Sequence, residues 1–336
     1  MPVSPAAPPQ QRPPAVLGIC GGVGPAAGVL LHQTLLEHTA GDGRDQCHLS
    51  VCHLSRSDDM TDRSEFLLQH STATDRVAGA DGGASSEDGR ERVENPAWGM
   101  ARTFAMMQAA LAAATSSSCE SARLVLGVPC NTFHAKPIWD EFLRLTAPTP
   151  SPSPSVRHVH MLEETVRFIA QYAPASTRIG LMATTGTRQS RVYHDLLEPR
   201  GYRIVEVPPL LQAELHESIY NSAWGIKSTA PAVTPRCVAN FHRYARQLKE
   251  SGAEVIVMGC TEIPFAFAGR KAVAGVLLID PLVALARAMI READPSRLKH
   301  LELQAAAAAA SSVAPVNKLL RPQTPTKNLK SCWSPR

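Results

Sequence analysis

Two cysteines of this chain, Cys130 and Cys260, stand directly after similar apolar stretches, LVLGVP at 124–129 and VIVMG at 255–259. Continuous apolar runs rich in β-branched residues are typical of strands buried on both faces of a parallel sheet. Ligands of open α/β sheets bind beyond the carboxyl ends of the strands, so a thiol at that place is positioned to meet a substrate. The alternative is a pair of buried cysteines without chemistry, because free cysteine is among the most buried residue types.

Three kinds of chemistry use cysteines of this sort. A redox pair usually has the local spacing C-x-x-C, which this chain lacks. A cysteine hydrolase needs one thiol and a histidine or acidic partner. The third chemistry inverts a stereocentre: one thiolate removes a proton from one face of a carbon, and the other thiol delivers a proton to the opposite face. We expect a helix to begin after each cysteine and to lower the thiol pKa below its usual value of about 8.5.

The elements that must position these thiols occur twice in the same order. The tripeptide LGI at 17–19 corresponds to IGL at 179–181, and VPC at 128–130 corresponds to MGC at 258–260. We therefore predict an α/β fold of two pseudo-symmetric α/β domains with mainly parallel sheets. Each domain would deliver one thiol to an active-site cleft between them.

The composition of the chain predicts where these halves begin and end. The first half spans residues 15–145 and contains an insertion at 79–94 that is rich in Gly, Ser and acidic residues. A Pro/Ser-rich insertion at 146–155 precedes the second half and its closing elements, residues 156–296. We expect the tails 1–14 and 297–336 to be disordered, because neither has the composition of a packed core.

A glycine-rich segment, GGVGP at 21–25, lies between an expected strand at 15–20 and an expected helix at 26–38. Backbone N–H groups at a helix N-terminus attract anions, so Gly22 and Gly24 are candidate ligands for a substrate carboxylate. A tight turn without a ligand is the alternative. The motif is not G-x-G-x-x-G and lacks the lysine of a P-loop, so it does not indicate a nucleotide.

The residues of the second expected strand, at 47–54, include two Cys-His pairs that could suggest a zinc site, but their geometry argues against one. Cys47 and His53 would face one side of that strand, whereas His48 and Cys52 would face the other. No second ligand pair follows at zinc-finger spacing. We predict no metal.

Charge and hydropathy limit the partners and the compartment. The 336 residues carry a net charge of +4, but residues 297–336 hold seven Lys or Arg against one acid, so the remaining chain is near −2 and gives no reason to expect nucleic acid. No apolar run has membrane-spanning length, and no signal-peptide pattern occurs at the N-terminus. Free thiols in a reducing compartment are expected. We predict a cytoplasmic protein without a membrane partner, while targeting to an organelle stays open.

Three blocks, in this order along the chain, resemble the cofactor-independent aspartate/glutamate/hydantoin racemase family: GGVGP at 21–25, CNTFH at 130–134 and GCTEIP at 259–264. The first is similar to the block that opens the aspartate racemase branch of this family. The resemblance runs from about residue 16 to residue 292. It implies a small amino-acid substrate, no pyridoxal phosphate or other cofactor, and a homodimer.

The resemblance also implies roles for individual residues. Cys130 and Cys260 match the two catalytic thiols of the family. The segment DRSEF at 62–66 and the pair IK at 226–227 resemble the segments that carry its two cations, which would clamp the carboxylates of an acidic substrate. The substrate-binding residues implied in this way are Arg63, Asn131, Thr132, Lys227 and Thr261.

Three positions bear on specificity and tuning. Glutamate racemases usually carry His where this chain has Glu262, which favours the aspartate branch, and Phe133 stands where a smaller residue is common. His134 is either a cation that tunes Cys130 or a packing residue. Glu262 either tunes Cys260 or merely favours a helix dipole.

We therefore predict a racemase that inverts the α-carbon of a small acidic amino acid, with aspartate as the first candidate. The alternatives are a related isomerase of the same fold, acting on glutamate, other amino acids, hydantoin or maleate, and a non-catalytic amino-acid-binding relative.

Overall fold

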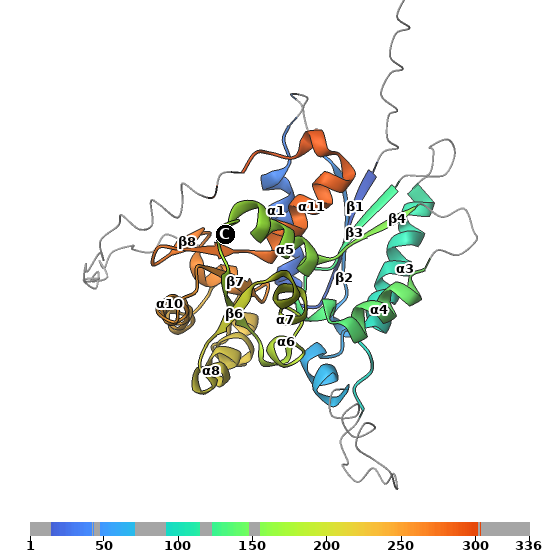
Figure 1. The fold of residues 1–336 in the computed structure, drawn as a ribbon. Coiled ribbons are helices and arrows are strands. Elements are labelled where there is room, and N and C mark those ends of the chain that lie inside the picture. The colour runs from blue at the N-terminus through green and yellow to red at the C-terminus, as the bar shows by residue number, and fades with distance from the viewer. Residues whose placement is uncertain are drawn as a thin grey trace, which may run out of the picture.

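The computed structural model describes residues 15–41, 43, 48–70, 92–114, 123–147, 155–301 and 303 (Figure 1). Its strands form two sheets with the orders β2-β1-β3-β4 and β6-β5-β7-β9-β8. The first sheet contains β1 (Ala15–Gly21), β2 (Ser50–Ser55), β3 (Arg123–Gly127) and β4 (Val156–Val159). The second contains β5 (Arg178–Ala183), β6 (Arg203–Glu206), β7 (Val255–Gly259), β8 (Ala272–Val273) and β9 (Val276–Ile279).

The two sheets repeat one arrangement. In each, the first strand in sequence lies between the second and the third, and the third carries a cysteine beyond its carboxyl end. All the strand pairs in the described residues are parallel except β8 with β9. The predicted fold class, two pseudo-symmetric α/β units with mainly parallel sheets, is therefore confirmed.

Helices cover both sheets. In Figure 1, α3 and α4 lie on one side of the first sheet, whereas α1, α5 and α11 lie on the other. The helices α8 and α10 accompany the second sheet. The α-helices are α1 (Pro25–His38), α3 (Ala97–Ala114), α4 (Lys136–Leu145), α5 (Met161–Tyr172), α6 (Thr185–Gln189), α7 (His194–Leu197), α8 (Pro209–Tyr220), α9 (Ile226–Thr229), α10 (Pro235–Glu250) and α11 (Pro281–Ala293).

The two halves of the chain interlock. Strand β4 follows the Pro/Ser-rich segment in sequence, yet it pairs with β3 and so belongs to the first sheet. Helix α11, near the end of the described chain, packs against α1, α5 and β3, and its side chains are buried on almost every side. The predicted division at 146–155 stays a prediction, but it does not coincide with the boundary between the sheets. Residues 148–154 and most of the 79–94 insertion lie outside the described residues, as do both tails except 297–301 and 303.

Two secondary-structure predictions were wrong. The sequence pattern predicts a helix from about residue 187 to about residue 198, but this helix is interrupted between α6 and α7, where Arg191 has a φ of 53°. The pattern also predicts one strand over 274–279, but the strand β9 begins only at Val276, because Ala274 and Gly275, with positive φ angles of 51° and 76°, form the turn after β8. In these places the backbone adopts left-handed conformations that apolar patterning does not reveal. No helix among the described residues is both long and apolar enough to cross a membrane.

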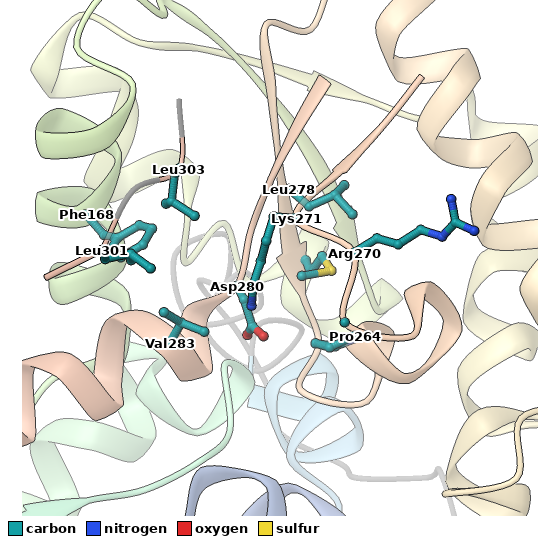
Figure 2. Close-up of a pocket in the computed structure, with 11 residues that line it drawn as sticks. Phe168, Pro264, Arg270, Lys271, Leu278, Asp280, Val283, Leu301 and Leu303 are labelled. Atoms are coloured by element: carbon teal, nitrogen blue, oxygen red, sulfur yellow. The ribbon is translucent and has the colours of Figure 1, made fainter. Parts of the chain in front are cut away.

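A small cavity of about 30 Å³ lies between residues of α5, α11, β7 and β9 and the side chains of Leu301 and Leu303 (Figure 2). Its walls are mainly apolar, with Phe168, Met258 and Val283 among them. Asp280 also lines it and caps α11 by accepting the backbone N–H of Leu282 at 2.9 Å. Burial in these surroundings raises the pKa of Asp280 from 3.8 to about 6.

Asp280→Asn is expected to stabilise the protein at pH 8 and not at pH 3.5. The folded state binds the proton of Asp280 more tightly than the unfolded state. In the wild type, protonated Asp280 therefore contributes to the free energy of unfolding fully below pH 3.8, and this contribution is lost as the pH rises through about 6. Asparagine keeps the capping acceptor without the charge. Thermal denaturation should show a melting temperature about 2 °C above that of the wild type at pH 8. A difference that does not change between pH 3.5 and pH 8 would contradict this account.

Candidate active site

The two thiols lie at the carboxyl edges of the two sheets. Cys260 directly follows β7, and Cys130 comes three residues after the end of β3. Their exposed fractions are 9% for Cys130 and 8% for Cys260. Each is followed by a single 3-10 segment, Thr132–His134 or Ile263–Phe267, and not by the start of an α-helix. The helix expected to begin directly after each cysteine is therefore not an α-helix in either half.

Cys260 is a protonated thiol at neutral pH. Its Sγ donates a hydrogen bond to Oε2 of Glu262 at 3.0 Å. Burial first, and the Glu262 carboxylate second, raise the pKa of Cys260 well above its ordinary value, although Lys227 acts in the opposite direction. The prediction that this thiol ionises readily was wrong, since desolvation and a neighbouring anion both oppose ionisation.

His134 holds the backbone at Cys130. Its Nδ1–H donates to the Cys130 carbonyl at 2.8 Å, and its ring stacks on Trp139 at 4.5 Å between centroids. Burial, reinforced by His160, lowers the pKa of His134 well below its usual value. His134 is therefore neutral near pH 7. The structure agrees with the packing alternative for this residue and gives no support to a cation beside the thiol.

Arg63 lies between the glycine-rich turn and Cys130, at the start of a helical segment over residues 63–70. The residue is 7% exposed, and its guanidinium donates to the carbonyls of Val23 at 2.9 Å and Thr61 at 3.0 Å. Burial alone would lower the pKa of Arg63, but Cys130, Tyr220 and nearby carboxylates outweigh it and raise the pKa. Arg63 is a fixed, permanent positive charge at this site.

Lys227 supplies a second cation from the second half of the chain. It lies in α9, with its ammonium 4.1 Å from the ring centroid of Tyr220. Burial acts to lower the pKa of Lys227, but Glu262, Tyr220 and Cys260 together raise it. Each predicted cation therefore lies near one thiol and near Glu262, and its role in binding a substrate carboxylate stays a prediction.

The polar residues that follow Cys130 form hydrogen bonds to the second half of the chain. Thr132 shares a hydrogen bond with Thr187 at 2.7 Å, and Tyr193 donates to Oδ1 of Asn131 at 2.5 Å. Thr261 donates to Oε2 of Glu262 at 3.0 Å. Sequence reasoning missed Thr187 and Tyr193 as parts of the site. A signal for Thr187 existed, because it follows β5 as the glycine-rich turn follows β1.

The glycine-rich turn is close-packed at both predicted positions. Gly22 has a φ of 100°, and a Cβ there would come within 2.6 Å of the Arg56 carbonyl oxygen. A Cβ on Gly24 would collide with Oε1 of Glu262. The group that the structure brings to this turn is therefore the Glu262 carboxylate, which reaches across from the second half.

Three buried donors at this site have no hydrogen-bond partner among the described residues: Nε of Arg63, Oγ of Ser64 and Nδ2 of Asn131. Buried polar atoms are rarely left unpaired in native proteins, so a group of them calls for an explanation. All three are donors that suit an anionic ligand, and Arg63 interacts electrostatically with the Cys130 thiol. Among the described residues no cluster of three or more potential metal ligands occurs, and Cys47 lies outside that part of the chain.

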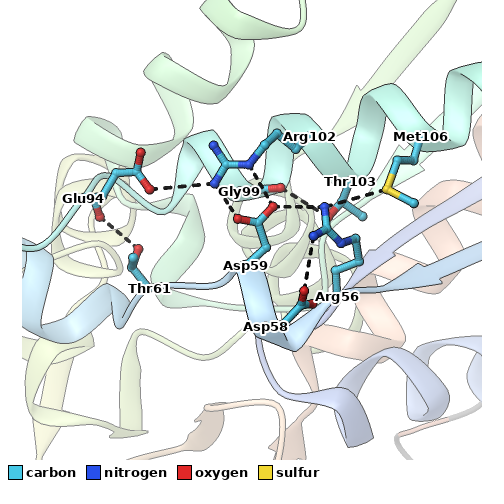
Figure 3. Close-up of polar contacts among 9 residues, drawn as sticks. All are labelled: Arg56, Asp58, Asp59, Thr61, Glu94, Gly99, Arg102, Thr103 and Met106. Atoms are coloured by element: carbon cyan, nitrogen blue, oxygen red, sulfur yellow. Dashed lines mark hydrogen bonds and ion pairs between the residues drawn. The ribbon is translucent and has the colours of Figure 1, made fainter.

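A surface network holds the loop that leads to Arg63 (Figure 3). Arg102 of α3 binds both carboxylate oxygens of Asp59, at 2.8 and 2.5 Å. Arg56 binds the same carboxylate at 3.1 Å, and Thr61 donates to the Glu94 carbonyl at 2.9 Å. Gly22 also packs closely against the backbone of Arg56. The network therefore connects α3 to the two segments that orient Arg63.

Arg102→Ala is expected to raise the KM for an acidic substrate on the order of fivefold, with kcat little changed, because small displacements of a binding group weaken binding. The free energy of unfolding should fall by about 1 kcal/mol or less, since the pair is exposed. Arg144→Ala is the matched control: it removes a similar two-bond pair, with Glu141, on the surface of α4. Steady-state kinetics that show equal KM values for the two variants would contradict the expectation.

Comparison with known proteins gives the family. The sequence model of the Asp/Glu/Hydantoin racemase family matches residues 21–289. The fold is similar to that of the aspartate racemase of Picrophilus torridus, with 18% identity, a TM-score of 0.57, and coverage of 85% of this chain and 96% of that one. It is also similar to an aspartate racemase homologue from Pyrococcus horikoshii OT3, with 17% identity, a TM-score of 0.53, and coverage of 83% and 99%.

A glutamate racemase from Roseiflexus sp. (strain RS-1) is 27% identical over 132 residues, which are 36% of this chain and 44% of that protein. An uncharacterized protein from Pectobacterium carotovorum is 32% identical over 90 residues, which are 26% of this chain. The chain thus matches only about half the length of these curated relatives, 44% and 55%. The family match, in contrast, includes both thiols and all the described strands after β1. The chain belongs to the Asp/Glu/Hydantoin racemase family.

Proposed function

We propose that this protein is a racemase of small acidic amino acids, with aspartate as the first candidate substrate, and that it works without pyridoxal phosphate through Cys130 and Cys260. One observation carries the proposal: the two thiols follow corresponding strands, β3 and β7, of two pseudo-symmetric sheets. Each thiol has a cation near it, and the Glu262 carboxylate interacts with both cations. Arg63 interacts with Cys130 and Glu262, and Lys227 interacts with Cys260 and Glu262.

The proposed reaction has two proton transfers. Cys260 carries its proton, which it donates to Glu262 in a hydrogen bond, and is the acid of the reaction, whereas Cys130 is the base that takes the α-proton of the substrate. The S–H bond of Cys130 forms as the Cα–H bond breaks, and the electron pair of that bond stays on the substrate. Cys260 then delivers its proton to the opposite face of the α-carbon and becomes the thiolate. The reverse direction exchanges the two thiols' roles.

The cations support an acidic substrate. Two carboxylates of an amino dicarboxylic acid match Arg63 and Lys227, which are both positively charged and largely withdrawn from water. A neutral amino acid would leave one of these cations without its anion, at a cost. Without an electron-accepting cofactor, the carbanion-like state needs stabilisation by fixed charges and donors. Arg63 and the amide of Asn131 are the candidates for that stabilisation.

The test is α-proton exchange in D₂O, followed by proton NMR with each enantiomer of aspartate and glutamate and without added pyridoxal phosphate. We expect deuterium at the α-carbon together with formation of the opposite enantiomer, fastest for aspartate. Binding of aspartate without exchange would indicate the non-catalytic relative, and isomerisation of maleate without exchange would indicate the related isomerase. Either outcome would overturn the proposal.

A further inference from the structure

Glu262 is the carboxylate that connects the two halves at the site. It is 2% exposed, and its Oε2 accepts hydrogen bonds from Cys260 and Thr261, both at 3.0 Å. Its Oε1 lies against Gly24 of the other half. Glu262 makes no capping hydrogen bond to the 3-10 segment that follows it. Glu262 therefore stands at the N-terminus of this segment, and its side chain also contacts Cys260, Thr261 and the glycine-rich turn.

The electrostatics place Glu262 among cations. Its carboxylate is the strongest of the neighbours that raise the pKa of Lys227, and it also acts on Arg63. Among the described residues, the carboxylates that act on Arg63 are Asp62 and Glu262. Asp62 already accepts the backbone N–H of Glu65 at 2.8 Å, so its carboxylate is used to begin the helical segment. Glu262 is the carboxylate that lies at the thiols.

We propose that the Glu262 carboxylate receives the α-ammonium group of the substrate, so that the site selects amino dicarboxylic acids over dicarboxylic acids without an amino group. This inference rests on the proposed function. It adds a group that recognises the third charge of the substrate, whereas Arg63 and Lys227 recognise the other two.

Charge matching supports this assignment. A bound amino dicarboxylic acid brings two negative charges and one positive charge, and Arg63, Lys227 and Glu262 present the complementary set. A dicarboxylic acid without the ammonium would place three carboxylates, Glu262 included, beside two cations, and one negative charge of this desolvated group would then be unmatched. A carboxylate has about four acceptor sites. Cys260 and Thr261 occupy two of them, both on Oε2, so an ammonium can be added without removing either.

The experiment compares Glu262→Gln with the wild type for binding of aspartate and of succinate, which lacks the amino group, by isothermal titration calorimetry of the full chain. Glutamine keeps an acceptor for Cys260 and loses the charge. We expect the affinity for aspartate to fall roughly 10- to 100-fold, as for other hydrogen bonds to charged groups. The affinity for succinate should stay the same or increase. An equal loss for both ligands, or no loss for aspartate, would overturn the assignment.

Two further variants keep the test decisive. Gly24→Ala should displace the carboxylate by collision with Oε1 and lower aspartate affinity selectively, so it replaces Glu262→Gln if that variant does not fold. Glu198→Gln is the matched control, because Glu198 pairs with Arg191 on the surface, away from the thiols. If the wild type binds aspartate through Glu262 but does not exchange its α-proton, the racemase proposal fails and this assignment holds. If the wild type exchanges the α-proton and Glu262→Gln binds aspartate as tightly as the wild type, the racemase proposal holds and this assignment fails.

Discussion

Replacing either Cys130 or Cys260 by serine is expected to lower the racemisation of aspartate by about 10³-fold or more, because a hydroxyl is a far weaker acid than a thiol and general acid–base groups contribute about that much. Both side chains are nearly the same size, so the fold should be retained. Racemisation is measured by circular dichroism of each enantiomer, and the fold by thermal denaturation. The two variants should also differ in the enantiomer whose α-proton they still exchange, since each keeps a different thiol.

Cys237→Ser provides the control for thiol loss. Cys237 is fully buried in the first turn of α10, where its Sγ donates to backbone carbonyls of Ser218 and Trp224. A serine hydroxyl can make the same bonds, so the activity of this variant should equal that of the wild type. Normal racemisation in both Cys130→Ser and Cys260→Ser would show that the two-thiol mechanism is incorrect.

The second large effect is expected from Arg63→Lys, which should raise the KM for aspartate by about 100-fold. The guanidinium uses two nitrogens to bind the carbonyls of Val23 and Thr61 and keeps Nε for a ligand. A lysine ammonium is a single point charge and cannot serve the two carbonyls and a substrate carboxylate with the same geometry. The measurement is the separate determination of KM and kcat, with the melting temperature as a check of folding.

Arg188→Lys is the comparison for Arg63→Lys. Arg188 is also partly buried, donates to the Val207 carbonyl at 3.1 Å and pairs with Glu206 at 2.7 Å. The substitution therefore removes contacts similar to those of Arg63, at a place that is not beside the thiols. We expect its KM for aspartate to stay within about twofold of the wild type, since changes outside the site leave binding almost unaffected. If both variants raise KM equally, Arg63 has no special part in substrate binding.

Much of the fold followed from sequence patterns. The sequence pattern predicts a strand at 178–183 and helices at 97–114 and 161–172, and these ranges agree at both ends with β5, α3 and α5. Patterning failed where single residues adopt left-handed conformations, at Arg191 and at the turn between β8 and β9. It also failed for β4, since sequence order does not determine which sheet a strand joins.

The sequence allowed the residues of the site to be predicted, but not their protonation or their orientation relative to one another. Strand ends and the motif resemblance led to the thiols and the cations. The pKa of Cys260 was predicted in the wrong direction, because the local rule for helix termini takes no account of burial or of Glu262. The orientation of Glu262 depends on its contact with Gly24, which lies 238 positions earlier in the sequence. No local pattern contains that information.

The position of α11 and β4 has a consequence for how the molecule holds together. A polypeptide ending near residue 147 would lack the edge strand of its own sheet and the apolar helix that covers it. The remaining fragment would carry that helix without α1 and β3, two of the elements against which it packs. The architecture is repeated, but neither repeat is self-sufficient. Denaturation should therefore disassemble both sheets in a single cooperative transition.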